Sequence, residues 1–130
     1  MSIAPGLKGR SETVVTEHNT ASAIGSGLVP VFATPHMIAL MENAAANSLL
    51  PYLAEGEGSV GTHLDVSHTS ATPIGMKVWA DTEVLAVDGK QITFQVTAYD
   101  ERGEIGRGTH QRFLIKTEKF LAKCQSKLEG

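Results

Sequence analysis

Several segments with the alternating hydrophobicity of β-strands, joined by tight turns, constrain the fold of this chain more than any other feature. Four strand segments are expected, at residues 59–68, 75–87, 90–100 and 105–116. The Asp88-Gly89 pair between the second and third segments favours a type I′ hairpin turn. A connection this short joins antiparallel neighbours, because parallel strands need a crossover of about a dozen residues. With a shorter strand at Thr13–Thr16, the pattern predicts an antiparallel sheet of about five strands.

The other dominant feature is one long apolar helix, expected over residues 34–50. Thr34 is an N-cap residue type, Pro35 suits the first helical turn, and strong helix formers follow. An antiparallel sheet needs a cover on one face, and no other expected element is long and apolar enough to supply it. The sequence therefore predicts an α+β chain with the hot-dog fold, in which the sheet wraps around this helix. A loop should occupy 19–31, and a short amphipathic helix 118–128.

Size and charge narrow the possible function classes. The chain has 130 residues, 42% of them hydrophobic, so one domain over residues 1–130 with a single core is expected. Its 11 basic and 14 acidic residues give a net charge of −3 without a basic stripe, which argues against a nucleic-acid partner. No stretch approaches the roughly 20 apolar residues that cross a bilayer, and no apolar leader is visible, so a cytoplasmic protein without a membrane partner is expected. The one cysteine, Cys124, provides no disulfide framework.

Glu42 is the one charged side chain in the apolar stretch of the expected helix. An ionised carboxylate in an apolar setting costs several kcal/mol unless it has a partner. Helical spacing places five residues on the side of the helix that should face the sheet, namely Ile38, Met41, Glu42, Ala45 and Leu49. Either Glu42 takes part in chemistry, or it is a structural carboxylate, exposed on the flank or paired with an arginine. Periodicity alone leaves both interpretations open.

His68 is the second candidate, because it ends an expected strand. Alternation gives one face to Val60, Thr62, Leu64, Val66 and His68, and the other to Gly61, His63, Asp65 and Ser67. The first face is apolar and should lie under the helix. A lone inward histidine is commonly a hydrogen-bonded core residue. Beside a carboxylate such as Glu42, it can instead act as a general base whose tautomer the carboxylate fixes.

Thr34 is the third candidate, and its structural explanation is an ordinary N-cap. A helix N-terminus also offers free N–H groups and the positive end of the dipole, where a developing oxyanion is stabilised. Along a regular helix, however, the eight residues from Thr34 to Glu42 span about 12 Å. The two can share a site only if the segment folds back or if two subunits contribute.

The histidines do not suggest a metal site. His63 and His68 are expected on opposite faces of one strand, and no further ligand stands at a usual spacing, so no metal is predicted. His18, His36 and His110 are expected at the surface or at strand ends.

Three stretches carry a resemblance to a known family, namely FATPHMIALMENAA, GEGSVGTHLDVSHTSATPIG and DERGEIGRGTHQRF. In this order and spacing they resemble the fluoroacetyl-CoA thioesterase family of hot-dog proteins, over about Val31 to Lys123. The resemblance implies a catalytic triad of Thr34, Glu42 and His68, with Gly61 against the acyl group. It also implies hydrolysis of an acyl-CoA thioester, with no cofactor beyond the coenzyme A of the substrate. A homodimer with sites at the subunit interface is implied as well, and the exposed sheet edge of a lone protomer favours one independently.

The loop before Phe32 departs from that family. The fluoroacetyl-specific enzyme carries an aromatic lid there, whereas Ala23–Val31 contains no aromatic residue and Leu28 stands at the main lid position. We therefore expect a more open pocket, bounded by Leu28 and Phe32, for another small or medium acyl group. Basic residues suited to the phosphates of coenzyme A are Arg107, Arg112, Lys116 and Lys119.

Two other function classes stay open on sequence grounds. An enoyl-thioester hydratase would share the fold, but the His and Asp pair typical of such hydratases is not found. A non-catalytic acyl-CoA or small-ligand binding protein would use Glu42 only as a buried, paired carboxylate.

Overall fold

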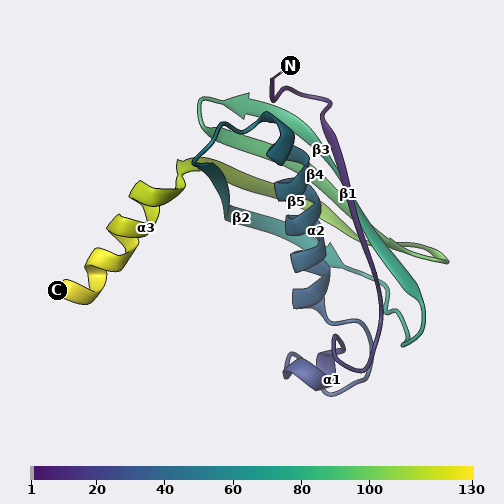
Figure 1. The fold of residues 1–130 in the computed structure, drawn as a ribbon. Coiled ribbons are helices and arrows are strands. Elements are labelled where there is room, and N and C mark those ends of the chain that lie inside the picture. The colour runs from purple at the N-terminus through teal and green to yellow at the C-terminus, as the bar shows by residue number, and fades with distance from the viewer. Residues whose placement is uncertain (1) are drawn as a thin grey trace.

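The computed structural model describes residues 2–130 and consists of one curled sheet, one long helix and two shorter helical segments (Figure 1). All neighbouring strands are antiparallel, in the order β1-β3-β4-β5-β2. The strands are β1 Lys8–Val14, β2 Glu57–His68, β3 Lys77–Asp88, β4 Gln91–Asp100 and β5 Gly103–Lys116. The helices are α1 Ala21–Ile24, α2 Thr34–Leu49 and α3 Thr117–Gln125, with 3-10 turns η1 Leu50–Tyr52 and η2 Ser126–Glu129. The predicted hot-dog fold, an antiparallel sheet around one helix, is confirmed.

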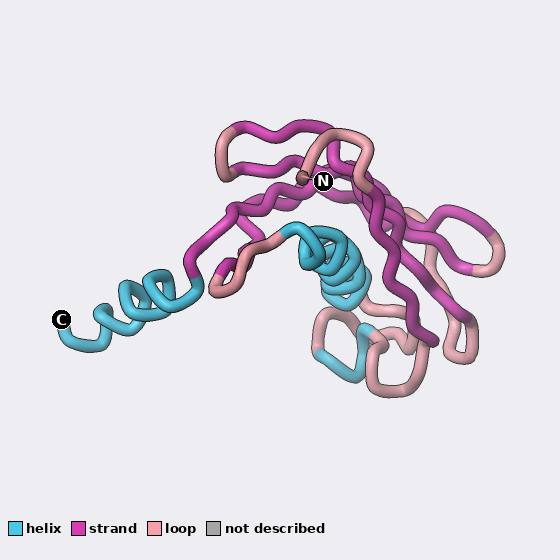
Figure 2. The backbone as a smooth tube through the Cα atoms, turned by 45° about the horizontal axis from the view of Figure 1, so that its top comes forward, coloured by secondary structure: helices cyan, strands magenta, loops and turns pink. Residues whose placement is uncertain are grey.

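Helix α2 lies in the concave side of the curled sheet (Figure 2). A glycine allows close contact there, since a Cβ on Gly9 of β1 would lie 2.5 Å from the carbonyl oxygen of Ala44. The buried residues of α2 are Met37, Leu40, Met41, Ala44, Ala45 and Leu49. The sheet opposes them with Val78, Ala80, Val84, Ile92, Phe94, Val96, Ala98 and Ile105. Full burial of a large apolar side chain contributes about 1.5–3 kcal/mol, so packing against the sheet is what stabilises α2.

The buried face of α2 is rotated from the predicted one. Met41, Ala45 and Leu49 are buried as expected, but Ile38 and Glu42 are only half-buried. The reason is that α2 packs more extensively on β1 than on β2. One flank of the helix, beside β2, is therefore left open.

A β-bulge in β2 overturns part of the predicted assignment of faces. The pairing of β2 with β5 shifts register between Gly61 and His63, so that Thr62 is an extra residue. Before the bulge the alternation is inverted, and Gly61 rather than Val60 lies on the helix side. After it, the residues up to His68 keep the predicted side. A bulge adds one residue to a strand, which alternation counted along the sequence cannot detect.

Strand β1 and the β3–β4 hairpin also differ in detail from the prediction. Strand β1 begins and ends earlier than the predicted Thr13–Thr16, because it is a polar edge strand held by backbone pairing with β3 and carries little apolar alternation. The hairpin turn consists of Gly89 and Lys90. Among the described residues only glycines have positive φ, so of this pair Gly89 alone does, at 62°. That pattern fits a type II′ turn and not the predicted type I′.

The predicted C-terminal helix is present as α3 followed by η2. These two segments project from the β2–β5 side of the sheet (Figures 1 and 2). Their side chains are exposed. Within residues 2–130, no helix combines the length and the apolar character needed to cross a membrane.

Candidate active site

The first part of the candidate site joins the start of α2 to the end of β2. Thr34 Oγ1 lies 2.7 Å from His68 Nδ1. The N-cap of α2 is Ala33, without a side-chain hydrogen bond, and Thr34 is already the first helical residue. The predicted N-cap role of Thr34 is therefore wrong. Its hydroxyl is free of the helix backbone and pairs with the imidazole.

Backbone hydrogen bonds hold both members of this pair in place. After His68 the chain turns back, and Thr69 N–H donates to the carbonyl oxygen of Ile105 at 2.8 Å. Before Thr34, Phe32 N–H donates to the carbonyl oxygen of Thr72 at 2.9 Å. The hydroxyl of Thr72 in turn donates to the buried carboxylate of Asp100 at 2.7 Å. Thr34 and His68 are thus fixed before any substrate binds, which lowers the entropy cost of reaching a reactive geometry.

The His68 ring is set up as a neutral proton acceptor. Burial lowers its pKa, and the nearby backbone of Ser70 has a smaller effect in the opposite direction. Nε2 is buried and has no hydrogen-bond partner within residues 2–130, so Nδ1 is the ring atom aimed at the helix start. A neutral imidazole with a free Nδ1 accepts the proton of the Thr34 hydroxyl.

A cavity of about 340 Å³ opens beside the Thr34–His68 pair. Its lining combines residues 20–31, which we call the lid segment, with the start of α2 and the loop after β2. The lining residues are Ala21, Ser26, Gly27, Val29, Val31, Phe32, Thr34, His68, Thr69, Ser70 and Ala71. Phe32, predicted to bound the substrate pocket, lines this cavity and is fully buried. Leu28, predicted to bound the pocket, is 96% exposed and lies outside the lining. The lid segment contains the short helix α1, which Thr20 caps by accepting a hydrogen bond from Ala23 N–H.

The second part of the candidate site surrounds Glu42, two helical turns after Thr34. Glu42 Oε2 lies 3.9 Å from Arg112 Nη1, so the arginine pairing considered from the sequence is present. Gly61 makes room for this carboxylate, because a Cβ there would lie 2.5 Å from Glu42 Oε2. The glycine thus allows a side chain of its own protomer to approach the strand.

His110 belongs to this second part, although the sequence analysis expected it at the surface or at a strand end. It is wholly buried, it accepts a hydrogen bond from Arg112 Nη1 at 3.2 Å, and Arg112 is 7% exposed. The two stand two residues apart on β5 and so share one face of the sheet. A histidine and an arginine two residues apart on a predicted strand lie on one face of it, and this spacing was the sequence signal that could have indicated a buried polar pair. Arg112, predicted to contact phosphates, instead lies beneath Glu42.

Each of the three predicted catalytic residues thus has a partner, but they form two groups. Hydrogen bonds and ion pairs of the described residues join Thr34 to His68 and Glu42 to Arg112, and none joins Glu42 to His68. Within residues 2–130, no three His, Cys, Asp or Glu side chains cluster in a way that could hold a metal ion.

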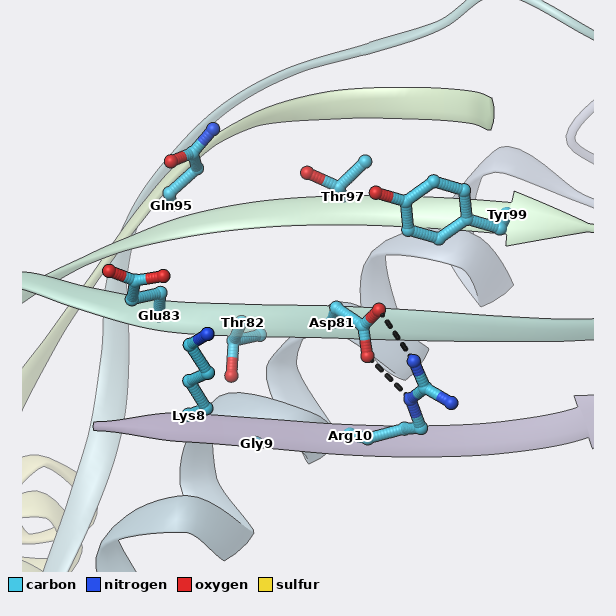
Figure 3. A pocket seen from close by; sticks show the side chains of 9 residues that line it. All are labelled: Lys8, Gly9, Arg10, Asp81, Thr82, Glu83, Gln95, Thr97 and Tyr99. Carbon is cyan, nitrogen blue, oxygen red and sulfur yellow. Dashed lines mark hydrogen bonds and ion pairs between the residues drawn. The ribbon is translucent and has the colours of Figure 1, made fainter. Parts of the chain in front are cut away.

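A separate groove of about 600 Å³ lies on the outer face of the sheet, across β1, β3 and β4 (Figure 3). Its lining is polar and charged, and Arg10 forms a two-pronged ion pair with Asp81 across it, with Nε 2.6 Å from Oδ1. None of the predicted site residues lines this groove. We therefore locate the candidate site on the helix side of the sheet.

Comparison with known proteins identifies the family of this chain. The sequence profile of the fluoroacetyl-CoA-specific thioesterases matches residues 15–118, which include both groups. The chain belongs to this thioesterase family. A fluoroacetyl-CoA thioesterase from Streptantibioticus cattleyicolor is 47% identical over 97 residues, which cover 75% of this chain and 70% of that protein.

Solved structures of the family and of related proteins share the fold. A structure of the fluoroacetyl-CoA thioesterase superposes with a TM-score of 0.92 at 38% identity and covers 98% of each chain. A thioesterase superfamily member from Thermus thermophilus gives a TM-score of 0.90 at 32% identity, with 98% of this chain and 94% of the other covered. The hot-dog thioesterase fold therefore extends over nearly the whole chain.

Proposed function

We propose that this protein is an acyl-CoA thioesterase that hydrolyses a small or medium acyl group. The observation that carries the proposal is the 2.7 Å contact between Thr34 Oγ1 and His68 Nδ1, two residues that line the same cavity, in a member of a thioesterase family. Water and the thioester supply all atoms of the reaction, so the proposal needs no cofactor. The acyl group occupies the cavity and the coenzyme A leads out of it.

In the proposed mechanism Thr34 and His68 work as a pair. The Thr34 hydroxyl touches the reacting group and relays a proton from the attacking water to Nδ1 of His68, so that Thr34 keeps a proton of its own. His68 then gives the transferred proton to the departing thiolate. The N-terminal N–H groups of α2 lie next to Thr34 and stabilise negative charge on the carbonyl oxygen. Glu42 supplies the carboxylate, either orienting the attacking water or attacking the thioester carbon itself.

The two groups of residues require a second subunit. Helix α2 is continuous, so Thr34 and Glu42 stand about 12 Å apart along it. Along β2, His68 and Gly61 are seven residues apart, or about 23 Å. We infer a two-fold dimer in which the free edges of two β2 strands pair antiparallel, with His68 opposite Gly61 of the partner subunit. That register carries the partner's Glu42 toward the Thr34–His68 pair and places the two-fold axis between Leu64 and Asp65.

Exposure along β2 supports this assembly. Residues 61–65 of this edge strand are exposed, and Leu64 is 36% exposed although it lies on the helix side of the sheet. A long free edge strand with an apolar side chain beside it is a surface that a second copy covers well.

The acyl preference follows from the lid. Residues 23–31 contain no aromatic side chain, and Leu28 points into solvent. We propose that the chain does not share the narrow fluoroacetyl preference named for its relatives. A cavity of about 340 Å³ has room for more than a two-carbon acyl group.

A panel of acyl-CoA thioesters, with free thiol detected by a colorimetric reagent, tests the activity. We expect turnover of several short and medium acyl-CoAs, including acetyl-CoA, and a loss of at least about 100-fold in Glu42→Ala and in His68→Ala. Tight binding without turnover would show a binding protein instead. Hydration of enoyl-CoA, followed by absorbance, would show a hydratase.

Mixing the two inactive variants tests the shared site. After denaturation and refolding together, half of the dimers combine one Glu42→Ala chain with one His68→Ala chain. If each site takes its carboxylate and its imidazole from different subunits, each mixed dimer has one intact site, and about a quarter of the wild-type activity returns. If both residues act within one subunit, no activity returns.

A further inference from the structure

Behind Glu42, the structure contains a buried polar pair that the proposed chemistry does not use directly. His110 has no exposed surface and Arg112 is 7% exposed, and both lie on β5 facing α2. Buried polar groups are costly unless each is hydrogen-bonded, so the arrangement of their partners is informative.

Both ring nitrogens of His110 and three of the five N–H groups of Arg112 have hydrogen-bond partners among the described residues. Arg112 Nε donates to Ser59 Oγ at 2.9 Å and Nη2 donates to the Ser59 carbonyl oxygen at 3.0 Å. Nη1 donates to His110 Nε2 at 3.2 Å. The second hydrogen of Nη1 is left for Glu42, whose Oε2 is 3.9 Å away.

The hydrogen bonds of His110 define its tautomer. His110 Nδ1 lies 2.9 Å from the carbonyl oxygen of His63. A carbonyl only accepts, so Nδ1 carries the proton. An arginine only donates, so His110 Nε2 must present its lone pair to Arg112. Both contacts are met only by a neutral ring protonated at Nδ1.

The surroundings of His110 also favour the neutral form. Burial lowers its pKa, and the positive charge of Arg112 on the same strand lowers it further. The hydrogen bond to His63 on β2 and the charge of Glu42 on α2 act in the opposite direction, while the side chain of His63 has a small lowering effect. Phe94 on β4 stacks on the ring with centroids 6.1 Å apart and carries no charge.

We propose that His110 is a positioning residue for the thioesterase site: its neutral ring holds Arg112 in the orientation that holds the carboxylate of Glu42. This inference rests on the proposed function of Glu42. A protonated His110 would point an N–H at the guanidinium, and the two cations would repel. Arg112 would then turn, and the carboxylate would lose its support. The protein should therefore lose activity on acidification through His110 as well as through His68.

Two substitutions of His110 separate the hydrogen bond from the space that the ring fills. His110→Gln places an amide oxygen near the position of Nε2 and keeps an acceptor for Arg112. His110→Asn places its amide nitrogen near the position of Nδ1 and keeps the donor to His63, but leaves Arg112 without its acceptor. We expect kcat to fall about 10- to 100-fold in the Asn variant, as for a reacting group displaced by a fraction of an ångström, with KM less affected. The Gln variant should recover most of that loss.

The pH profile provides a readout that simple packing would not change. In the wild type, kcat/KM should fall on acidification with a slope to which His68 and His110 each contribute one, because both must be neutral. In His110→Gln the slope should be lower by one, because residue 110 no longer titrates. Equal slopes, or equal kcat in the Gln and Asn variants, would overturn the proposal. If the Asn variant does not fold, the profiles of the wild type and the Gln variant decide alone.

A measurement without substrate separates this proposal from the proposed function. Nitrogen-15 chemical shifts of the histidine rings distinguish a neutral ring protonated at Nδ1 from one protonated at Nε2. We expect His110 in the Nδ1–H form at neutral pH, and an Nε2–H or a charged ring would refute the inference whether or not the protein hydrolyses any thioester. Wild-type protein that turns over no acyl-CoA would instead refute the proposed function.

Discussion

Replacing Gly61 with alanine adds one methyl group between β2 and α2. The new Cβ would lie 2.5 Å from Glu42 Oε2, 3.1 Å from His110 Cε1 and 3.5 Å from Arg112 Nη1. Carbon and oxygen atoms in ordinary contact stay about 3.5 Å apart, so the carboxylate must move by about 1 Å. The ring of His110 and the guanidinium of Arg112 need to move by only a few tenths of an ångström or less. The substitution thus moves one group selectively.

The expected effect on stability is small. Gly61 is not among the glycines with positive φ, so alanine adopts its backbone conformation without strain. Gly→Ala at such a position stabilises by about 0.4–1 kcal/mol through the unfolded chain. Turning Glu42 away from its preferred rotamer costs about 0.5–1.5 kcal/mol. The two contributions nearly cancel. Activity should respond strongly, because a misplacement of 1 Å costs about 100-fold in kcat/KM.

The assay compares kcat/KM and the thermal unfolding midpoint in the wild type, Gly61→Ala and Gly58→Ala. Gly58 lies on the same strand but on the opposite face, and a Cβ there would meet Thr117 Oγ1 at 3.0 Å, far from the site. We expect the control to keep its activity and Gly61→Ala to lose it at an unchanged midpoint. If both variants lost activity equally, or if the loss followed a fall in the midpoint, the reasoning would be refuted.

Three further predictions follow from the same geometry. Thr34→Val keeps the shape of the side chain and the Ala33 N-cap but removes the hydrogen bond to His68, so kcat should fall about 10- to 100-fold without a change in melting temperature. Leu28→Phe restores an aromatic lid and should lower kcat/KM for the longest accepted acyl-CoA about 10-fold relative to acetyl-CoA, whereas an unchanged ratio would exclude the lid as the determinant. Burial lowers the pKa of His68 and of His110, so below about pH 6.5 the unfolded chain binds more protons than the folded one. The free energy of unfolding, measured with urea, should therefore decrease as the pH falls below that value. A free energy of unfolding that does not change with pH in this range would contradict the prediction.

Much of the fold was predictable because it depends on local chemistry. Tight turns between apolar strands require antiparallel neighbours, and a single long apolar helix must cover their inner face. The first strand was misplaced because β1 is a polar edge strand whose position depends on pairing with β3. Pairing of this kind leaves little trace in hydrophobic periodicity.

The candidate site was predictable in its residue types but not in its connections. Glu42 attracted attention because a carboxylate in an apolar helix is costly, and the structure places Arg112 beside it. The bulge at Thr62 could not be seen in the alternation pattern, so the sequence put Gly61 on the wrong face. His110 was missed because a histidine near charged residues on a strand looks like a surface residue until the sheet is closed over it.

Glycines on the sheet connect the packing of α2 to both parts of the site. At the start of the helix, a Cβ on Gly106 would lie 2.7 Å from Met37 Sδ, so this glycine lets β5 approach the first turn, where Thr34 reaches His68. At the middle, Gly61 makes the space that the Glu42 carboxylate occupies. Because one continuous helix carries both Thr34 and Glu42, a change in its packing displaces these two candidate residues together. The same rigidity keeps the two groups apart within a protomer, and this is why we expect the working site to need a second chain.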